Sequence, residues 1–297
     1  MVHQDSRAEL SEHSAEQIDL SVVLPCYNER GVIEESTAEI VRVLEATRLS
    51  WEIIFVDDVS KDDTVARAER LCAADRRLQL IRHERNTGRG RTATDGLRAA
   101  RGAIAGFLDI DLEVPARYIP PAVEAIRAGA DIICAWRIYL PNLQLLHREV
   151  LSKGYSRLVR GQLGLPLRDT EAGFKFFDRA RILPILDQTR NPGWFWDTEV
   201  MARAYFAGLR IVELPAVFVK RNEVPTTVRI IPDTIEYWRQ LRRFRPEVAR
   251  LRAEGRRIAA GGGHAPWATT IDDRAAWAET RAALTTPEPL PTETRRS

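Results

Sequence analysis

The chain has 297 residues, of which 44% are hydrophobic and 29% are charged, as is usual for a globular protein with a large core. Its 44 Lys and Arg residues nearly balance its 42 Asp and Glu residues, and a net charge of +2 gives no indication of a nucleic-acid partner. Three cysteines without metal-ligand spacing predict free thiols in a reducing compartment, and no apolar stretch suits a signal peptide or a membrane span. We therefore expect a cytoplasmic protein, soluble or at most peripheral to the inner face of a membrane.

Short apolar runs alternate with helical patterns in the first half of the chain. Buried strands are predicted at residues 18–25, 51–57, 78–83, 104–110 and 131–136. Apolar residues at helical spacing separate the first three of these runs. Because such alternation implies right-handed crossovers, the predicted fold class is α/β, with a mostly parallel central sheet covered by helices on both faces.

A polar segment follows each of the first four predicted strands. These segments read CYNE, DDVSKDDT, ERNTGRGRT and DIDLEVP. In open α/β sheets, ligands bind beyond the carboxyl ends of the strands. The four segments therefore predict a binding site at one edge of the sheet.

The fourth segment carries three acids, Asp109, Asp111 and Glu113, at alternating positions. On an extended strand their side chains would share one face, where they would repel one another unless a cation lay between them. Oxygen ligands suit Mg²⁺ or Mn²⁺, and Mg²⁺ usually keeps water and substrate phosphates as its other ligands. We predict a metal–diphosphate site on these acids; a solvated turn with scattered acids is the alternative.

The C-terminal part is basic and has a different character. Residues 235–245, IEYWRQLRRFR, place Ile235, Trp238, Leu241 and Phe244 at helical spacing among arginines. Such a helix could lie on an anionic bilayer, or it could pack against the rest of the protein, which is the plainer expectation. Residues 1–17 are predicted to be a flexible N-terminus and residues 255–297 a mobile tail.

The ordered motifs resemble a known family. The segments VVLPCYNE, FVDDVSKDDT, RNTGRGRTATDGLRAARG and FLDIDLEVP are similar, in order and spacing, to the nucleotide-sugar half of glycosyltransferase family 2, which has the GT-A fold. The segments at 168–179 and 194–218 resemble its polyprenyl-phosphate branch, typified by dolichyl-phosphate mannosyl- and glucosyltransferases. This resemblance implies one domain at 18–254, with a nucleotide-sugar half at about 18–136 and an acceptor half at about 137–254.

The resemblance further implies a GDP- or UDP-hexose donor at the predicted edge. It assigns donor binding to Pro25, Tyr27, Glu29, Asp57, Asp58, Gly88, Arg89 and Asp109. Tyr27 would offer a ring face, Asp57 would accept a hydrogen bond from the base, and Arg89 or Arg91 would face phosphate. Ordinary loop capping is the alternative for the polar residues. Val59 replaces the glycine that is usual in this loop of the family.

On the acceptor side, the resemblance implies that arginines hold a polyprenyl phosphate. Arg148 and Ser152 lie one helical turn apart, and Arg137 and Arg221 follow predicted strands. A guanidinium group suits phosphate oxygens because it can donate two parallel hydrogen bonds. An exposed helix face is the alternative for Arg148 and Ser152. After Arg221 the chain departs from the glycine and Ser-Lys pair usual in this branch.

Two acids are the predicted catalytic residues, Asp111 through the metal and Asp197 through proton transfer. Asp197 would act as a base on a hydroxyl acceptor, or it would only cap the helix that follows it. A phosphate acceptor is already anionic and needs no base. The resemblance thus implies an inverting, metal-dependent transfer to polyprenyl phosphate. A small-molecule or glycan hydroxyl acceptor and a non-catalytic nucleotide-sugar-binding protein are the alternatives.

Overall fold

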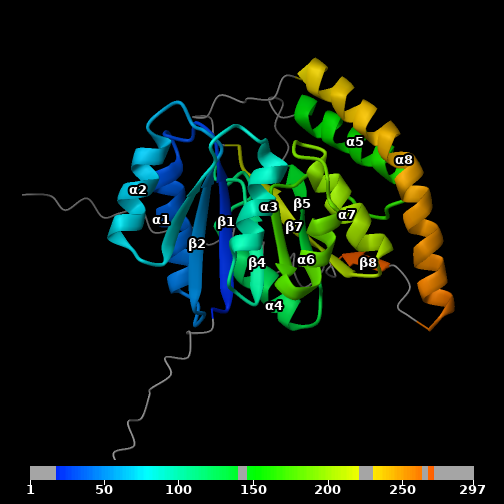
Figure 1. Ribbon diagram of the computed structural model, residues 1–297, viewed down its shortest axis with the longest axis horizontal. Helices are drawn as coiled ribbons and strands as arrows, with labels where there is room; N and C mark the ends of the chain where they lie inside the picture. The colour runs from blue at the N-terminus through cyan, green and yellow to red at the C-terminus, as the bar shows by residue number, and fades with distance from the viewer. Residues whose placement is uncertain (1–17, 140–145, 221–229, 263–266, 271–297) are drawn as a thin grey trace, which may run out of the picture.

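The computed structural model describes residues 18–139, 146–220, 230–262 and 267–270, and its centre is one eight-stranded sheet (Figure 1). The strand order is β3-β2-β1-β4-β6-β5-β7-β8. The strands are β1 Leu20–Cys26, β2 Trp51–Asp57, β3 Leu78–Arg82, β4 Ile104–Leu108, β5 Ile132–Tyr139, β6 Phe174–Asp178, β7 Arg210–Phe218 and β8 Trp267–Thr270. The five strands predicted from sequence correspond to β1–β5.

The sheet is mostly parallel, as predicted. Strands β3, β2, β1 and β4 pair in parallel, and so do β5, β7 and β8. Strand β6 lies between β4 and β5 and runs antiparallel to both. All seven residues of β2 are buried, as expected for a strand covered on both faces.

Helices cover both faces of the sheet, which confirms the predicted fold class. The helices are α1 Ile33–Glu45, α2 Thr64–Ala74, α3 Arg89–Ala99, α4 Ile119–Arg127, α5 Leu146–Leu163, α6 Arg179–Gln188, α7 Trp196–Phe206 and α8 Ile230–Ala260, with a short 3-10 turn, η1, at Ala116–Tyr118. Helices α1, α2 and α4 bury apolar side chains in the core on one face. Helices α3, α6 and α7 do so on the other face.

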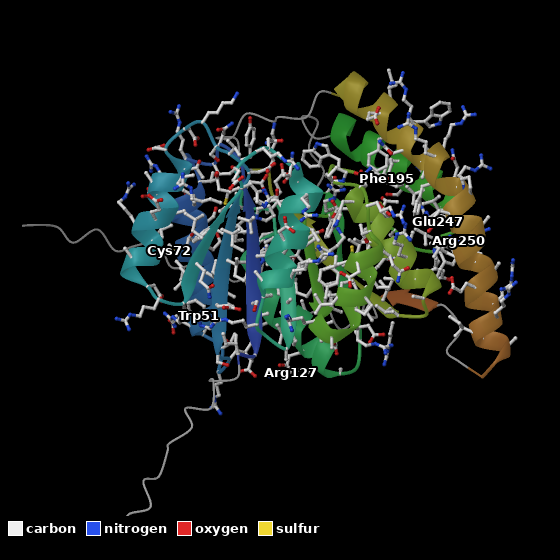
Figure 2. The ribbon with its side chains drawn as sticks, viewed as in Figure 1. Trp51, Cys72, Arg127, Phe195, Glu247 and Arg250 are labelled. Carbon is white, nitrogen blue, oxygen red and sulfur yellow. The ribbon has the colours of Figure 1, made fainter. Side chains whose placement is uncertain are left out.

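A third apolar cluster joins α5, α7 and α8 beside the sheet (Figure 1). Phe195 lies where α7 meets α8 (Figure 2), and its ring contacts Tyr237 and Phe244 edge to face. Nearby, Arg203 Nη1 of α7 lies 3.0 Å from Glu247 Oε1 of α8. Helix α8 therefore packs against the domain from Tyr237 to Leu251, which is the plainer of the two expectations.

The opposite face of α8 carries apolar side chains outward. Ile235 and Trp238 are 46% and 43% exposed, whereas Leu241 and Phe244 of the same predicted stripe are buried. Throughout the described residues, the helices are too short or too polar to cross a bilayer.

Regular structure continues past the predicted start of the tail at residue 255. Helix α8 extends to Ala260, beyond Leu251, which is its last residue in the third cluster, and β8 adds a parallel strand to β7. Residues 1–17 and 271–297 lie outside the described residues, so the predictions for them are untested.

Candidate active site

The polar segments predicted to form a binding edge do come together. Strands β1, β2 and β4 are parallel neighbours, so the residues after Cys26, Asp57 and Leu108 emerge at the same edge of the sheet. Helix α3 begins at Arg89 beside them. Gly88 N–H donates to Asp58 Oδ2 at 2.8 Å, which ties the start of this helix to the end of β2.

Asp57 is buried at the end of β2, and one of its carboxylate oxygens is unpaired in the described part of the chain. Its Oδ2 accepts hydrogen bonds from the N–H groups of Val59 and Ser60, both at 3.0 Å. Its Oδ1 is buried and has no hydrogen-bond partner among the described residues. Because an unpaired buried acceptor is costly, this oxygen is suited to a donor group on a ligand.

Asp58 organises the loop before α3. Its carboxylate accepts hydrogen bonds from the N–H groups of Thr87 and Gly88. It also accepts one from His83 Nδ1 when that ring nitrogen carries the proton. Burial alone would raise the pKa of Asp58, but these hydrogen bonds outweigh it and lower the pKa below its ordinary value. Asp58 therefore holds the loop that carries Arg89.

Glu29 and Tyr27 follow β1. Burial raises the pKa of Glu29 to about 8, and the charges of Asp111, Asp109 and Asp62 add to the increase. Oε2 of Glu29 is buried without a hydrogen-bond partner in the described part of the chain. Tyr27 is 37% exposed, so its ring is open to a ligand, while Pro25 is half-buried within the strand.

The three acids do not form the row on an extended strand that the sequence predicted. Strand β4 ends at Leu108, and a turn follows in which Leu112 N–H donates to Asp109 O at 3.0 Å. Leu112 has a φ of 50°, so the backbone leaves the extended conformation that alternation requires. The turn was not predicted because Leu112 is buried and apolar, as a strand residue would be.

The chemistry of the acids still suits a divalent cation. Burial raises the pKa of Asp111 to about 7, and repulsion from Asp109 and Glu113 contributes further. A cation would relieve this repulsion. Within the described residues, no three His, Cys, Asp or Glu side chains are arranged to hold a metal ion by themselves. Mg²⁺ commonly takes only one or two protein carboxylates with substrate phosphates, so these residues fit such an ion.

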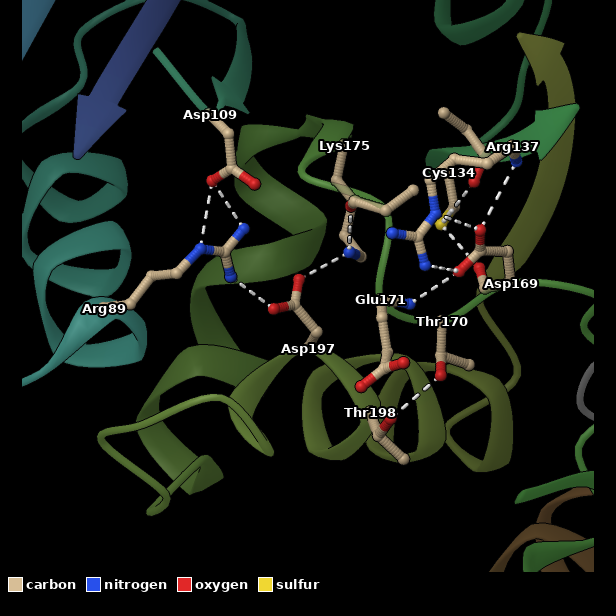
Figure 3. A network of polar contacts seen from close by, with 12 residues as sticks. Arg89, Asp109, Cys134, Arg137, Asp169, Thr170, Glu171, Lys175, Asp197 and Thr198 are labelled. Atoms are coloured by element: carbon tan, nitrogen blue, oxygen red, sulfur yellow. Dashed lines mark hydrogen bonds and ion pairs between the residues drawn. The ribbon is translucent and has the colours of Figure 1, made fainter. Parts of the chain in front are cut away.

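Arg89 lies between two carboxylates (Figure 3). Its Nε and Nη2 donate to Asp109 Oδ1 at 3.0 and 2.7 Å, and its Nη1 donates to Asp197 Oδ2 at 2.5 Å. The Arg89 guanidinium, which we expected to face phosphate, is therefore bound to two carboxylates. Arg91, the alternative, instead pairs with Asp95 on the exposed side of α3.

The glycines before and within α3 allow close approach of another part of the protein. Gly88 has a φ of 91°, and a Cβ there would lie 2.7 Å from Pro192 O. A Cβ on Gly90 would lie 2.3 Å from Cβ of Trp196. The neighbour that requires these glycines is the segment from Pro192 to Trp196, where α7 begins.

Asp197 does not cap α7, which corrects one of the two roles considered for it. The helix begins at Trp196 with Phe195 as N-cap, so Asp197 lies within the first turn. Its carboxylate is 2% exposed; Oδ1 accepts from Lys175 Nζ and Oδ2 accepts from Arg89. Both oxygens are therefore engaged by cationic groups.

Two residues of this centre were missed by the sequence predictions. Lys175 is fully buried, and its Nζ also donates to Ala172 O at 2.7 Å. The signal was its place in the apolar strand FKFF, because a buried lysine needs a charged partner. A Cβ on Gly173 would lie 1.7 Å from Asp109 Oδ2, so only glycine leaves room for that carboxylate.

The predicted acceptor residues are only partly described. Arg137 donates from Nε and Nη2 to the two oxygens of Asp169, at 2.7 and 3.1 Å (Figure 3). Arg148 and Ser152 lie on α5, one turn apart as predicted, but their side chains are outside the described residues. Arg221 also lies outside the described residues.

A polar cluster joins the loop before β6 to α5, α7 and α8. Thr198 Oγ1 lies within hydrogen-bond distance of Thr170 Oγ1, Tyr155 Oη and Tyr237 Oη. The half-buried Glu171 lies beside this cluster (Figure 3). Burial raises the pKa of Glu171 to about 8. The sequence analysis assigned no role to the residues of this cluster, because nothing in their local sequence distinguishes them from ordinary helix or loop residues.

This fold and this edge of the sheet define the class of the protein as a glycosyltransferase with the GT-A fold. The chain belongs to glycosyltransferase family 2, since the sequence model of the family described as “Glycosyl transferase family 2” matches residues 21–181. Glucosyl-3-phosphoglycerate synthase from Mycobacterium tuberculosis, solved with Mn²⁺, UDP and glucosyl-3-phosphoglycerate, shares the fold. Its TM-score is 0.56 at 20% identity, over 75% of this chain and 77% of that one.

Curated relatives support the polyprenyl-phosphate branch. Dolichyl-phosphate beta-glucosyltransferase of Saccharomyces cerevisiae is 30% identical over 72% of this chain and 71% of its own length. Dolichol-phosphate mannosyltransferase of Pyrococcus furiosus is 28% identical over 78% of this chain and 66% of its own length. Glycosyltransferase AglD of Haloferax volcanii is 32% identical over 80% of this chain, which spans only 39% of that relative. These relatives are transferases, which disfavours the non-catalytic alternative.

Proposed function

We propose that the protein transfers a hexose from a GDP- or UDP-sugar to a polyprenyl phosphate, with inversion at the anomeric carbon. The observation that carries the choice of acceptor is the environment of Asp197. Both its oxygens are bound by the cationic groups of Arg89 and Lys175, so the carboxylate is poorly placed to remove a proton from a hydroxyl. A phosphate acceptor needs no such base.

The donor would occupy the edge formed by β1, β2 and β4. Asp57 Oδ1 would accept a hydrogen bond from the base, with the ring of Tyr27, Pro25 and Glu29 around the nucleoside. Asp111, with Asp109 and Glu113, would hold Mg²⁺ or Mn²⁺. Such an ion supplies charge neutralisation for a departing diphosphate. Asp58 and Gly88 would fix the loop that brings Arg89 to this place.

The acceptor phosphate would bind on the other side of the anomeric carbon. We assign it to arginines of the acceptor half, Arg137, Arg148 and Arg221, together with Ser152. Asp169 holds the Arg137 guanidinium in a fixed plane by two hydrogen bonds. These arginines would hold the anionic acceptor phosphate near the anionic donor, so that the ionised acceptor oxygen can attack from the face opposite the diphosphate.

The protein would meet its lipid acceptor as a peripheral protein at the cytoplasmic face of a membrane. Supporting this proposal, α8 displays exposed Trp238 and Ile235 beside exposed arginines, and Arg242 stacks over the Trp238 ring at 4.6 Å. The same helix contributes Tyr237 to the polar cluster at Thr198, so α8 lies beside the residues that we assign to the acceptor side.

Turnover of a donor panel tests the proposal. Purified full-length protein would be offered GDP- and UDP-hexoses with a short polyprenyl phosphate, with the corresponding polyprenol as a matched hydroxyl acceptor, and each reaction would be repeated in chelator. We expect transfer to the phosphate alone, lost in chelator. Arg148→Ala should lower kcat/KM by about 30- to 1,000-fold, equivalent to 2–4 kcal/mol. Transfer to the polyprenol, with Arg148→Ala fully active, would contradict the proposal.

A hydroxyl acceptor remains the second candidate because of one observation. Glu171 is half-buried beside Thr198, and with a pKa of about 8 it would become a proton-accepting carboxylate as the pH rises towards 8. If hydroxyl transfer were observed, Glu171→Gln should abolish it, whereas phosphate transfer should survive that change.

A further inference from the structure

Four side chains of alternating charge form a continuous series across the site (Figure 3). The series runs from Asp109 through Arg89 and Asp197 to Lys175. Each member comes from a different part of the fold: the turn after β4, the start of α3, the first turn of α7, and β6. The two inner members, Arg89 and Asp197, each have a charged partner on either side.

The series becomes more buried with distance from the acids. Asp109 is 36% exposed, Arg89 13%, Asp197 2% and Lys175 0%. Phe107 of β4 lies below, with its ring centroid 5.3 Å from both the Arg89 guanidinium and the Lys175 ammonium. Screening by solvent is weak in such surroundings, so each ion pair depends strongly on the pairs beside it.

We infer that Lys175 is a positioning residue which, through Asp197 and Arg89, sets the affinity of Asp109 for a divalent cation. The inference rests on the proposed function, which places a cation at Asp109 and Asp111. Arg89 donates twice to Asp109 Oδ1, so a cation that uses this oxygen competes with the guanidinium. Asp197 draws the guanidinium away from Asp109, and Lys175 limits that pull because it shares the same carboxylate.

Substitutions of Asp197 and Lys175, the two members farthest from Asp109 along the series, should therefore have opposite effects on Mn²⁺ affinity. In Asp197→Asn, Arg89 loses one anionic partner and binds Asp109 more firmly, so Mn²⁺ should bind about tenfold more weakly. In Lys175→Met, Asp197 depends on Arg89 alone and draws it away, so Mn²⁺ should bind about tenfold more tightly. Arg91→Gln removes a positive charge from α3, the helix that carries Arg89, without touching the series, and should change Mn²⁺ affinity little.

A long-range field from the buried charges would give the same signs, and Arg89 distinguishes the two explanations. In an Arg89→Gln background the link between Asp109 and Asp197 is gone. If the effect is transmitted through the guanidinium, Asp197→Asn and Lys175→Met should then leave Mn²⁺ affinity unchanged. If it is only a field, both shifts should persist at full size. This is a double-mutant cycle with metal affinity as the readout.

Mn²⁺ binding to the full chain would be followed by the loss of the free-ion electron paramagnetic resonance signal, with Mn²⁺ alone and with GDP or UDP. Opposite shifts that vanish in Arg89→Gln support the inference. Shifts that are absent, or that persist in that background, overturn it and leave the proposed function intact. A wild-type chain that binds no Mn²⁺ under any of these conditions overturns both. Circular dichroism would confirm folding; if Lys175→Met does not fold, the Asp197→Asn arm decides alone.

Discussion

Val59 has a backbone conformation that its side chain disfavours. Its φ is 67°, and a left-handed conformation is most costly for β-branched residues. The conformation allows the N–H groups of Val59 and Ser60 to reach Asp57 Oδ2. Backbone strain is thus located beside the buried oxygen to which we assign the base of the donor.

Val59→Gly should stabilise the protein. Glycine removes the steric cost of the left-handed backbone, about 1–2 kcal/mol, and loses part of this gain to a more flexible unfolded chain. We expect the free energy of unfolding, measured by urea denaturation, to rise by about 1 kcal/mol. Val59→Ala is the control, because it keeps a Cβ and should gain less. A glycine variant less stable than the wild type would show that Val59 is unstrained.

Glu171 should make stability depend on pH. Burial is the main cause of its raised pKa; Asp169 and Asp197 add to the increase, while Arg137 and Lys175 oppose it. The hydroxyls of Tyr155 and Tyr237 lie near the same carboxyl group. Because the folded pKa of about 8 exceeds the ordinary value of 4.5, the unfolded chain releases this proton first. Its contribution to stability is therefore full below about 4.5 and is lost as pH rises towards 8.

Glu171→Gln removes the titrating proton and keeps a similar shape. Relative to wild type, the variant should gain stability progressively between pH 4.5 and pH 8, and no further gain should appear above this range. Thermal melting of both proteins across this range would measure the difference. A constant difference at every pH would mean that the pKa of Glu171 is not raised in the folded protein.

At the scale of elements, the sequence predicts strands well where apolar runs are continuous. The strand starting at Trp51 begins and ends as predicted, because all its residues are buried and Asp57 ends the apolar run. The turn at Asp109–Leu112 was not predictable from alternation, since Leu112 is buried in a turn as it would be in a strand. Nor was the pairing of Asp197 with Arg89, which joins residues 108 positions apart.

Strand β6 shows a second limit. Its sequence is an apolar run like those of its neighbours, yet it inserts antiparallel between β4 and β5. Pattern alone reports burial on both faces and gives no direction, because strand pairing is decided by distant partners. The insertion matters for function because it places Lys175 against Asp197 and Gly173 against Asp109.

Helix α8 should bind anionic membranes through its outward face. Trp238→Ser removes an exposed aromatic ring flanked by arginines, and should weaken binding to anionic vesicles about tenfold in co-sedimentation at low salt. Ile258→Ser is the matched control, since Ile258 is 43% exposed on the same helix but lies more than five turns away. High salt should weaken binding of both variants. Equal binding by wild type and Trp238→Ser would exclude this surface as the contact.

At the scale of the whole molecule, charge is separated although the net charge is only +2. The acids Glu29, Asp109 and Asp111 gather at the donor edge, where their mutual repulsion raises the pKa values of Glu29 and Asp111 beyond the effect of burial. Exposed arginines gather on α8. The divalent cation at the donor edge and an anionic lipid surface would each meet the opposite charge.

The C-terminal strand should support the sheet as a whole. Strand β8 pairs in parallel with residues 210–213 of β7, whose other residues are nearly all buried. A chain ending at residue 262 would leave β7 as the sheet edge, with unpaired backbone groups that favour aggregation. We expect it to lose about 2 kcal/mol of stability, the balance between the hydrogen bonds lost and the entropic cost of ordering β8, which the shorter chain no longer has. A chain ending at residue 270 keeps β8 and is the matched control. Urea unfolding and light scattering of the two truncated chains would test this; equal stability would mean that β8 contributes nothing and that the protein's essential fold ends with α8.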